Sequence, residues 1–338
     1  MAIIEVGDTV AVIGAGMVGV CCALELQRRG VKVTLLDRRE PGRETSYGNA
    51  GVMSRSSLVP LNNPALREMA WQLLLKRLPS FRYSARYALR HAAWIKSFMS
   101  HADERASLAT ASALDQLIVL SLGEHRRLMH EAGATQRMRD DGWLFLFRND
   151  AAYAASQRSR RTYERHGVNI ETLDAEGIQR LEPHLAPIFS RALWIKDAIT
   201  IDDPGALIDN YARLFVERGG TLRRVEVTSA QPQPGHRRWT LRGDDAFELT
   251  VGRVVVALGP WSRGFLKRLN VHVPMAFERG YHMHYAASVD GTLTRPIFDT
   301  GGGYVMSPMQ QGLRVCTGVE FNDLDAPKSL APPRHAKV

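Results

Sequence analysis

The sequence predicts an α/β fold with two domains, one of them a Rossmann-type dinucleotide-binding domain. Two observations carry this prediction. A glycine-rich fingerprint lies between two predicted strands near the N-terminus, and a second buried strand runs into Ala257 and Gly259, more than 200 residues later. The 338 residues fit two domains at roughly 150 residues each. We therefore expect a dinucleotide-binding domain that is assembled from separated segments of the chain.

The fingerprint Gly14-Ala15-Gly16-Met17-Val18-Gly19 follows the apolar run Thr9–Ile13 directly. A helix is predicted over Val18–Arg29, with Gly30 at its C-terminal end, and a second strand over Val31–Leu36, which Asp37 closes. In this context Gly14 makes the tight turn, Gly16 lets the backbone approach a pyrophosphate, and Gly19 lets the helix pack on the strand. The helix N-terminus offers free N–H groups to phosphates, and Asp37 is placed to accept hydrogen bonds from ribose hydroxyls. The alternative is a glycine-rich turn in another α/β fold.

The fingerprint alone does not separate FAD from NAD. Asp37 argues against a 2′-phosphate, but Arg38 and Arg39 follow it, so NADP stays open. The segment Glu44-Thr45-Ser46-Tyr47-Gly48-Asn49-Ala50-Gly51 is small, polar and glycine-rich, and it comes where an NAD domain usually continues into a helix. Such a loop can wrap a larger cofactor, although a plain surface loop has the same composition. An NAD-dependent dehydrogenase is the weaker alternative.

Composition and charge bound the partners and the compartment. The net charge is +9, carried mostly by arginines that are spread along the chain, which gives no reason to expect a nucleic-acid partner. Three cysteines without a CxxC spacing predict neither a disulfide framework nor a metal site. The N-terminus has no positive region before its apolar stretch, and no run of about 18 apolar residues is present, so we expect a cytoplasmic protein without a transmembrane helix.

Five motifs, in chain order, carry a family resemblance: GAGMVG, ETSYGNAG, VVVALGPWS, PMAFERGYH and GGYVMSPMQQGLRVCTGVEF. Their ordered combination resembles the D-amino-acid oxidase-like superfamily of FAD enzymes, and looks closest to its D-amino-acid dehydrogenase branch. The resemblance covers about residues 8 to 327. It implies FAD as the cofactor, a discontinuous Rossmann-type FAD-binding domain, and an α+β substrate domain with a large mixed sheet. The implied boundaries are 1–65 and 201–274 for the FAD-binding domain, and 66–200 and 275–326 for the substrate domain.

The resemblance also implies which residues bind the cofactor and the substrate. The cofactor-binding residues are Gly14, Gly16, Met17, Val18, Gly19, Asp37, Arg38, Ser46, Asn49, Ala50, Gly51, Val227, Ala257, Gly259 and Trp261. The candidate catalytic residues, which would hold the substrate, are Arg279, Tyr281, Tyr304 and Arg314, with His282 beside them. A bidentate arginine suits a substrate carboxylate, and a solvated strand residue is the alternative for each arginine.

The implied reaction is oxidative deamination, in which a hydride passes from Cα to flavin N5 and the resulting imine hydrolyses to a 2-oxo acid and ammonia. The electron acceptor is a quinone or oxygen. An amine oxidase of the glycine or sarcosine type is the alternative enzyme. The family's C-terminal GxRPxxPDxxPxIG-type strand does not occur before Val338, so we expect weak FAD binding, and a truncated, inactive, flavin-free remnant is the alternative of another class.

The remaining patterns predict helices and strands between these motifs. Helices are expected over Arg67–Leu78, Ser84–Ser100, Ala106–His130 and Gly205–Arg218, and strands over Gly142–Phe147, Thr221–Val227 and Arg253–Ala257. The stretch Lys76–Lys96 mixes basic and aromatic residues, and this composition permits peripheral contact with the cytoplasmic face of a membrane. A packed helix with one solvated face is the alternative for that stretch.

Overall fold

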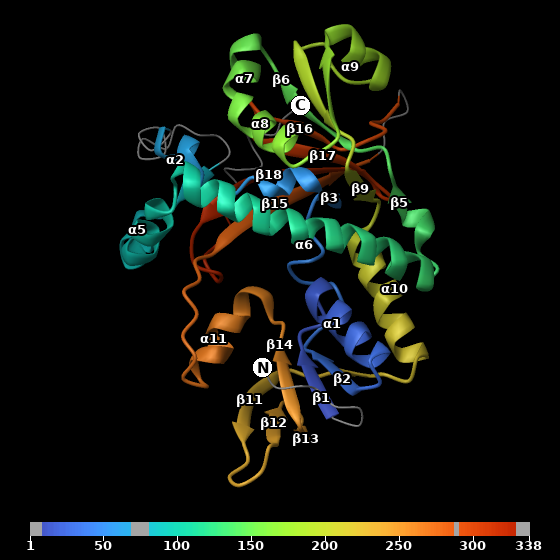
Figure 1. Cartoon of the computed structure of the whole chain (residues 1–338). Helices are drawn as coiled ribbons and strands as arrows, with labels where there is room; N and C mark the ends of the chain where they lie inside the picture. The colour runs from blue at the N-terminus through green and yellow to red at the C-terminus, as the bar shows by residue number, and fades with distance from the viewer. Residues whose placement is uncertain (1–8, 69–80, 287–290, 329–338) are drawn as a thin grey trace. The chain divides into compact units, whose positions relative to one another are not determined.

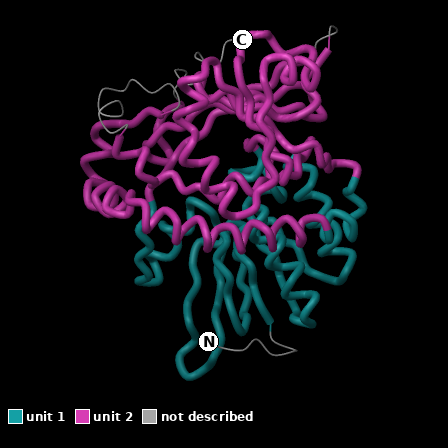
Figure 2. Tube along the Cα trace, turned by 45° about the horizontal axis from the view of Figure 1, so that its top comes forward, with its two compact units in different colours: residues 1–47, 127–135, 204–275 teal, residues 48–126, 136–203, 276–338 magenta. Residues whose placement is uncertain are grey.

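The computed structural model describes residues 9–68, 81–286 and 291–328. The chain divides into two compact units (Figure 2). The first unit contains residues 1–47, 127–135 and 204–275, and the second contains residues 48–126, 136–203 and 276–338. Most of the predicted helix Arg67–Leu78 and the first part of the stretch Lys76–Lys96 lie outside the described residues.

The two units differ from the predicted domains mainly at residues 48–65 and 127–135. Residues 48–65 belong to the second unit, because strand β3 (Val52–Ser54) pairs there with β9 (Ala198–Ile201). Residues 127–135 belong to the first unit, where Glu131 forms an ion pair with Arg218 at 3.0 Å. Both differences come from contacts between segments far apart in sequence.

A four-stranded parallel sheet in the order β10-β2-β1-β14 forms the centre of the first unit. Its strands are β1 (Thr9–Ile13), β2 (Lys32–Asp37), β10 (Thr221–Arg224) and β14 (Arg253–Val256). Helices α1 (Met17–Arg28) and α10 (Pro204–Glu217) lie beside each other (Figure 1), and the Gln27 amide donates to the carbonyls of Phe215 and Arg218. The Rossmann-type arrangement and the assembly from separated segments are thereby confirmed.

A three-stranded antiparallel sheet completes the first unit and corrects one prediction. It consists of β11 (Val227–Pro232), β12 (Trp239–Gly243) and β13 (Glu248–Val251), and the unit ends with the 3-10 turn η3 (Gly259–Trp261) and helix α11 (Ser262–Lys267). The single strand predicted over Thr221–Val227 is wrong, because β10 ends at Arg224 and Val227 opens β11. The break coincides with a change of partner: the Val225 N–H still donates to the Asp37 carbonyl at the end of β2, whereas the Glu226 N–H donates to the Asp244 side chain.

An eight-stranded mixed sheet dominates the second unit and confirms the large mixed sheet that the resemblance implies. Its order is β15-β18-β17-β16-β6-β8-β7, with β4 also paired to β18. The strands are β4 (Phe81–Tyr83), β6 (Trp143–Phe147), β7 (Ile170–Asp174), β8 (Arg191–Ile195), β15 (Glu278–Tyr285), β16 (Ile297–Asp299), β17 (Tyr304–Met309) and β18 (Gly312–Phe321). Only β16–β6 and β18–β4 pair in parallel.

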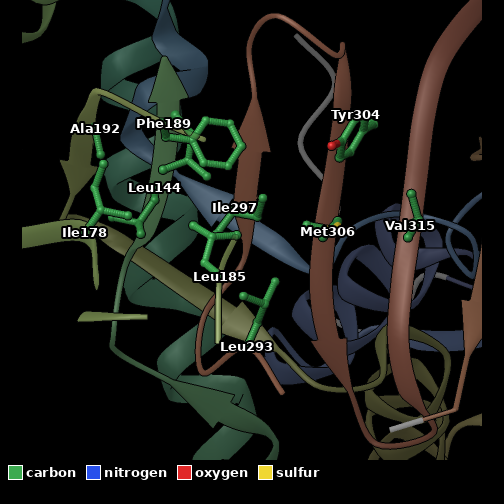
Figure 3. Packing of buried hydrophobic residues seen from close by; sticks show 11 residues of the cluster. Leu144, Ile178, Leu185, Phe189, Ala192, Leu293, Ile297, Tyr304, Met306 and Val315 are labelled. Atoms are coloured by element: carbon green, nitrogen blue, oxygen red, sulfur yellow. The ribbon is translucent and has the colours of Figure 1, made fainter. Parts of the chain in front are cut away.

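The two faces of this sheet carry different residues. Leu144, Ile297, Met306 and Val315 face each other across four strands and belong to one buried cluster (Figure 3); we call this side the core face. Because neighbouring strand residues point to opposite sides, Val305, Cys316 and their strand partner His282 lie on the other side. We call that side the loop face, since the loop Gly48–Gly51 contacts it.

Smaller elements surround the sheet. A short sheet joins β3, β9 and β5 (Met138–Arg139). The helices of this part of the chain are α2 (Pro64–Glu68), α4 (Ala85–Arg90), α5 (Ala92–Ser100), α6 (Glu104–Glu131), α7 (Asp150–Ala155), α8 (Gln157–Arg165) and α9 (Ala175–Leu181), with 3-10 turns η1 (Arg55–Leu58) and η2 (Thr135–Arg137). The predicted helix Ser84–Ser100 is interrupted at His91, which ends α4 and starts α5. The membrane contact predicted for this region stays a prediction.

Helix α6 has the length and the apolar composition that a membrane span requires. Its most apolar window has a mean hydropathy of 1.4, and 6% of that window is buried. One face nevertheless packs on the protein, since Leu114 and Ile118 contact a buried cluster and Asp115 forms an ion pair with Arg55 at 2.9 Å. One such helix is weak evidence for a membrane protein.

Candidate functional site

Only glycine fits at two positions of the fingerprint, one in the turn after β1 and one in the first turn of α1. Gly14 has a φ of +110°, and a Cβ placed there would lie 2.4 Å from the Ala257 carbonyl oxygen. A Cβ on Gly19 would lie 1.7 Å from the Gly14 carbonyl oxygen. These are the roles that the fingerprint predicts for a tight turn and for close packing of α1 on the sheet.

The N-terminus of α1 is open to an anion. Gly16 is the N-cap residue without a side-chain cap, and no acidic side chain lies in the first turn. The Met17 N–H donates to the Ser46 hydroxyl at 3.1 Å, and the exposed Val18 shows 68% of its surface. The N–H groups of the first turn and the positive end of the helix dipole suit a pyrophosphate, and no acidic side chain lies in that turn.

Two backbone N–H groups fix the orientation of the Asp37 carboxylate. One of its carboxylate oxygens accepts from the Ala15 N–H at 2.6 Å, and the other accepts from the Arg39 N–H at 2.9 Å. Each oxygen keeps a further lone pair for a hydroxyl. Arg38 and Arg39 both form ion pairs with Glu44, at 2.9 and 3.0 Å. These arginines are thus engaged by a carboxylate, an arrangement that favours a 2′-hydroxyl over a 2′-phosphate beside Asp37.

The remaining predicted cofactor residues of the first unit lie near the ends of its strands. The Ala257 N–H donates to the Ile13 carbonyl at 2.8 Å, so β14 ends beside the glycine turn. Gly259 has a φ of +53°, a left-handed backbone conformation that favours glycine. The Trp261 ring lies 4.5 Å from the Arg38 guanidinium. Val227 is buried in the hydrophobic cluster beneath β11.

Asn49, Ala50 and Gly51 belong to the second unit, in a loop with a fixed conformation. The Asn49 side chain accepts from the Gly51 N–H at 2.8 Å, and the Gly51 carbonyl accepts from the Ile201 N–H at 2.7 Å. Gly51 has a φ of +67°, and a Cβ there would lie 2.3 Å from the Ile201 carbonyl oxygen. The loop is therefore an ordered part of the second unit, and its contact with a cofactor stays a prediction.

Two of the four predicted substrate residues lie together. The Tyr281 hydroxyl donates to the Glu320 carboxylate at 2.6 Å, and Arg279 forms an ion pair with the same carboxylate at 3.6 Å. The Arg279 guanidinium also stacks on the Tyr281 ring, 5.7 Å from its centroid. Glu320 was missed by sequence reasoning, because its pairing with Arg279 depends on the register of β15 and β18.

Tyr304 lies apart from that pair, in the buried cluster on the core face (Figure 3). Burial raises the pKa of its hydroxyl, and the neighbouring Asp299 carboxylate, with which it shares a hydrogen bond, raises that pKa further. Asp299 is fully buried and also accepts from Arg148 at 2.6 Å and from the N–H of Gly302 at 2.9 Å. The contact of Tyr304 with a substrate stays a prediction. Its place in the buried cluster and its hydrogen bond with Asp299 give it a structural role.

We expect Tyr304→Phe to lower the free energy of unfolding by about 1.5–3 kcal/mol, the usual effect of removing one hydrogen bond to a charged group. Since Asp299 keeps its other partners, we expect kcat/KM to change less than threefold. Urea unfolding and steady-state kinetics of the variant measure the two effects. A loss of kcat/KM above tenfold without a loss of stability would place Tyr304 in the substrate site instead.

Arg314 lies on the loop face, in a row that crosses three strands. Its strand partners are Ser307 on β17 and His284 on β15, and the side chain is only 2% exposed. Its Nε donates to His284 Nε2 at 2.8 Å, and one terminal nitrogen donates to the Asn49 carbonyl at 2.8 Å. His284 was missed by sequence reasoning, although the alternation His282-Met283-His284 places both imidazoles on one side of a strand.

Cys316 occupies the neighbouring row. Its thiol lies 3.7 Å from the Gly48 carbonyl oxygen, and burial raises its pKa to about 11, with Arg314 opposing that shift. Within the described ranges, no group of three or more His, Cys, Asp or Glu side chains is arranged to hold a metal ion.

Together, the glycine turn, the open helix N-terminus and the oriented Asp37 define a Rossmann-class dinucleotide-binding protein. A family model described as FAD dependent oxidoreductase matches residues 9–336. The chain therefore belongs to this family of FAD-dependent oxidoreductases, and the predicted family and cofactor are confirmed.

Several named proteins resemble the chain. It is 30% identical over 323 residues to the D-amino-acid oxidase of Bradyrhizobium diazoefficiens, a match that covers 95% of this chain and 76% of that protein. It is 27% identical to the D-amino acid dehydrogenase of Sinorhizobium medicae, over 90% of this chain and 72% of that protein. Among solved structures, glycine oxidase from Geobacillus kaustophilus superposes with a TM-score of 0.67 at 17% identity, covering 97% of this chain and 76% of its own. This last likeness shows the fold.

Proposed function

We propose that this chain catalyses the FAD-dependent oxidative deamination of a D-amino acid. The observation that carries the proposal is the glycine turn after β1 together with the fixed Asp37 carboxylate. The chain belongs to the FAD-dependent oxidoreductase family. The relatives named D-amino-acid oxidase and D-amino acid dehydrogenase support the substrate class. The product of C–N oxidation is an imine, which water hydrolyses to a 2-oxo acid and ammonia.

The residues of the first unit fit FAD. The N-terminus of α1 would hold the pyrophosphate, and Asp37 would hold the adenosine ribose. When bound, FAD accepts the two electrons of the Cα–H bond as a hydride. The substrate amine must be neutral for this reaction, so its proton is lost to water or to a protein group before or during the oxidation. Oxygen or a quinone would be the final electron acceptor.

Arg279 and Tyr281 are the residues that we propose to hold the substrate carboxylate. Both side chains converge on the Glu320 carboxylate, and this contact supports the proposal. The Arg279 side chain is 14% exposed and that of Glu320 13%, so a substrate carboxylate would have to replace Glu320 or share the arginine with it. A guanidinium and a phenol hydroxyl together give charge-assisted recognition of a carboxylate.

The first experiment is an anaerobic titration of the FAD-loaded chain with amino acids, followed by the flavin absorption bands. Bleaching by D-amino acids and not by their L-enantiomers supports the proposal. Bleaching by glycine or sarcosine alone would replace it with a small-amine oxidase. A folded protein that takes up no FAD would contradict the proposal and favour the flavin-free remnant. Re-oxidation by air or by a soluble quinone then identifies the electron acceptor.

We expect Tyr281→Phe to raise the KM for a D-amino acid about tenfold, because one hydrogen bond to a carboxylate is lost. The flavin content should stay unchanged, since Tyr281 lies on β15 in the second unit and the glycine turn belongs to the first. Glu320→Gln is the informative companion, because it removes the competing carboxylate and should lower KM. Unchanged kinetics in both variants would remove this pair from the substrate site.

A further inference from the structure

The loop Gly48–Gly51 lies directly on the loop face of the large sheet. The Gly48 carbonyl is 3.7 Å from the Cys316 thiol, and a Cβ on Gly48 would lie 2.8 Å from His282 Nδ1. At the other end, a Cβ on Gly51 would lie 3.3 Å from Met309 Cε. The loop therefore crosses both rows of side chains, and its backbone packs against the sheet without room for side chains at these glycines.

Between these two ends, Arg314 makes the directional contact. Its guanidinium donates to the Asn49 carbonyl at 2.8 Å, and its Nε donates to His284 Nε2 at 2.8 Å. Arg314 is almost fully buried, whereas His284 is exposed at the end of β15. An arginine holds two acceptors in a fixed relation, because its N–H groups are fixed in one plane. The imidazole and the loop carbonyl are thus joined through one rigid group.

We propose that Arg314 and His284 are positioning residues that fix the loop Gly48–Gly51 on the sheet, and that this anchored loop is required for tight FAD binding. The FAD part of the proposal rests on the proposed function. It is supported by chain connectivity: Asn49 follows Ser46 by three residues, which span at most roughly 11 Å, and Ser46 accepts from the N–H of Met17 at the N-terminus of α1. Arg314 would then act through the loop and would not touch the substrate.

The anchor depends on the protonation of His284, because Nε2 accepts a hydrogen bond only while it carries no proton. The charged and titratable groups that face His284 are Arg314, His282 and Asp203. Burial lowers the pKa of His284, Arg314 lowers it further, and Asp203 opposes both. At neutral pH the imidazole is therefore neutral, and it accepts the hydrogen bond from Arg314. As the pH falls through this lowered pKa, the imidazolium repels Arg314, and the hydrogen bond between Arg314 and His284 is lost.

The test follows two properties from about pH 5 to pH 8, a range that spans the ordinary imidazole pKa. Hydrogen-exchange protection of the loop amides is measured in the FAD-free protein, and the FAD dissociation constant is measured by fluorescence. His284→Phe removes the acceptor, whereas His284→Gln keeps an acceptor that does not titrate. His236→Gln is the matched control, because His236 is exposed in the turn between β11 and β12.

In the unmodified chain we expect loop protection to fall and the FAD dissociation constant to rise as the pH is lowered. His284→Phe should raise that constant about 10- to 100-fold at neutral pH, the effect of one charge-assisted hydrogen bond. His284→Gln should restore neutral-pH binding and abolish the pH dependence, and His236→Gln should behave as the unmodified chain. Arg314→Lys keeps the charge but loses the planar guanidinium that bonds two acceptors, so it should resemble His284→Phe.

Two results would overturn the proposal. If His284→Phe leaves loop protection unchanged, the pair does not anchor the loop. If loop protection falls while the FAD dissociation constant is unaltered, the loop is anchored but does not govern FAD binding. Failure of the unmodified chain to bind FAD at any pH would instead overturn the proposed function, and the exchange measurement would still decide the anchoring role.

Discussion

Replacing Gly19 with alanine is expected to abolish FAD binding. The added methyl group would lie 1.7 Å from the Gly14 carbonyl oxygen, which is backbone, so neither a rotamer change nor a small shift relieves the clash. Helix α1 must move away from β1, and its N-terminal N–H groups move with it. We expect a loss of FAD affinity above 100-fold, measured by fluorescence titration, and a lower thermal midpoint.

Gly264→Ala is the matched control for that substitution. Gly264 lies in the interior of α11 in the same unit, and a Cβ there meets nothing within 4 Å. Alanine favours a helix over glycine by about 1 kcal/mol, so the control should bind FAD normally and unfold at a slightly higher temperature. Normal FAD affinity in Gly19→Ala would show that the glycine turn is not the cofactor cradle.

Glu182→Ala is expected to be the most destabilising single change in the second unit. Glu182 is fully buried and accepts hydrogen bonds from the Thr294 hydroxyl and N–H and from the Arg295 N–H. It also forms an ion pair with Arg295 at 3.3 Å, and the Arg295 side chain is only 12% exposed. Removal of the carboxylate leaves a buried guanidinium and two backbone donors without their acceptor, which costs about 3–5 kcal/mol.

Urea unfolding measures that loss, and Glu176→Ala provides the comparison. Glu176 lies on the neighbouring helix α9, with a side chain that is 87% exposed in its pair with Arg180. An exposed pair contributes little, so this control should change the free energy of unfolding by less than about 1 kcal/mol. A loss below 1 kcal/mol in Glu182→Ala would mean that water replaces the carboxylate and that the segment Thr294–Arg295 does not need it.

The first unit could be predicted from the sequence because its determinants are local. The run Thr9–Ile13, the glycines at fixed spacing and the closing Asp37 lie within 29 residues, and each position has one steric or hydrogen-bonding function. The prediction of one strand over Thr221–Val227 was wrong for the opposite reason. Its break after Arg224 depends on the contact of the Glu226 N–H with the Asp244 side chain, a residue outside the predicted strand.

The substrate residues could be named but not grouped from the sequence. Arg279, Tyr304 and Arg314 lie on neighbouring strands, yet they have different partners: Glu320, Asp299 and His284. Their grouping depends on strand register, and a bulge between Gly280 and His282 changes the register of β15 against β18. One residue of register reverses the face of every following side chain, and no local pattern in the sequence shows a bulge of this kind.

The burial of Cys316 limits the reactivity of its thiol toward oxidants. Peroxide oxidises the thiolate form of cysteine, and a thiol with a pKa of about 11 is ionised to roughly one part in ten thousand at pH 7. The cysteine that touches the loop Gly48–Gly51 therefore reacts slowly with peroxide. We expect oxidation of this protein to begin at other side chains, so that the contact between the loop and the sheet is retained.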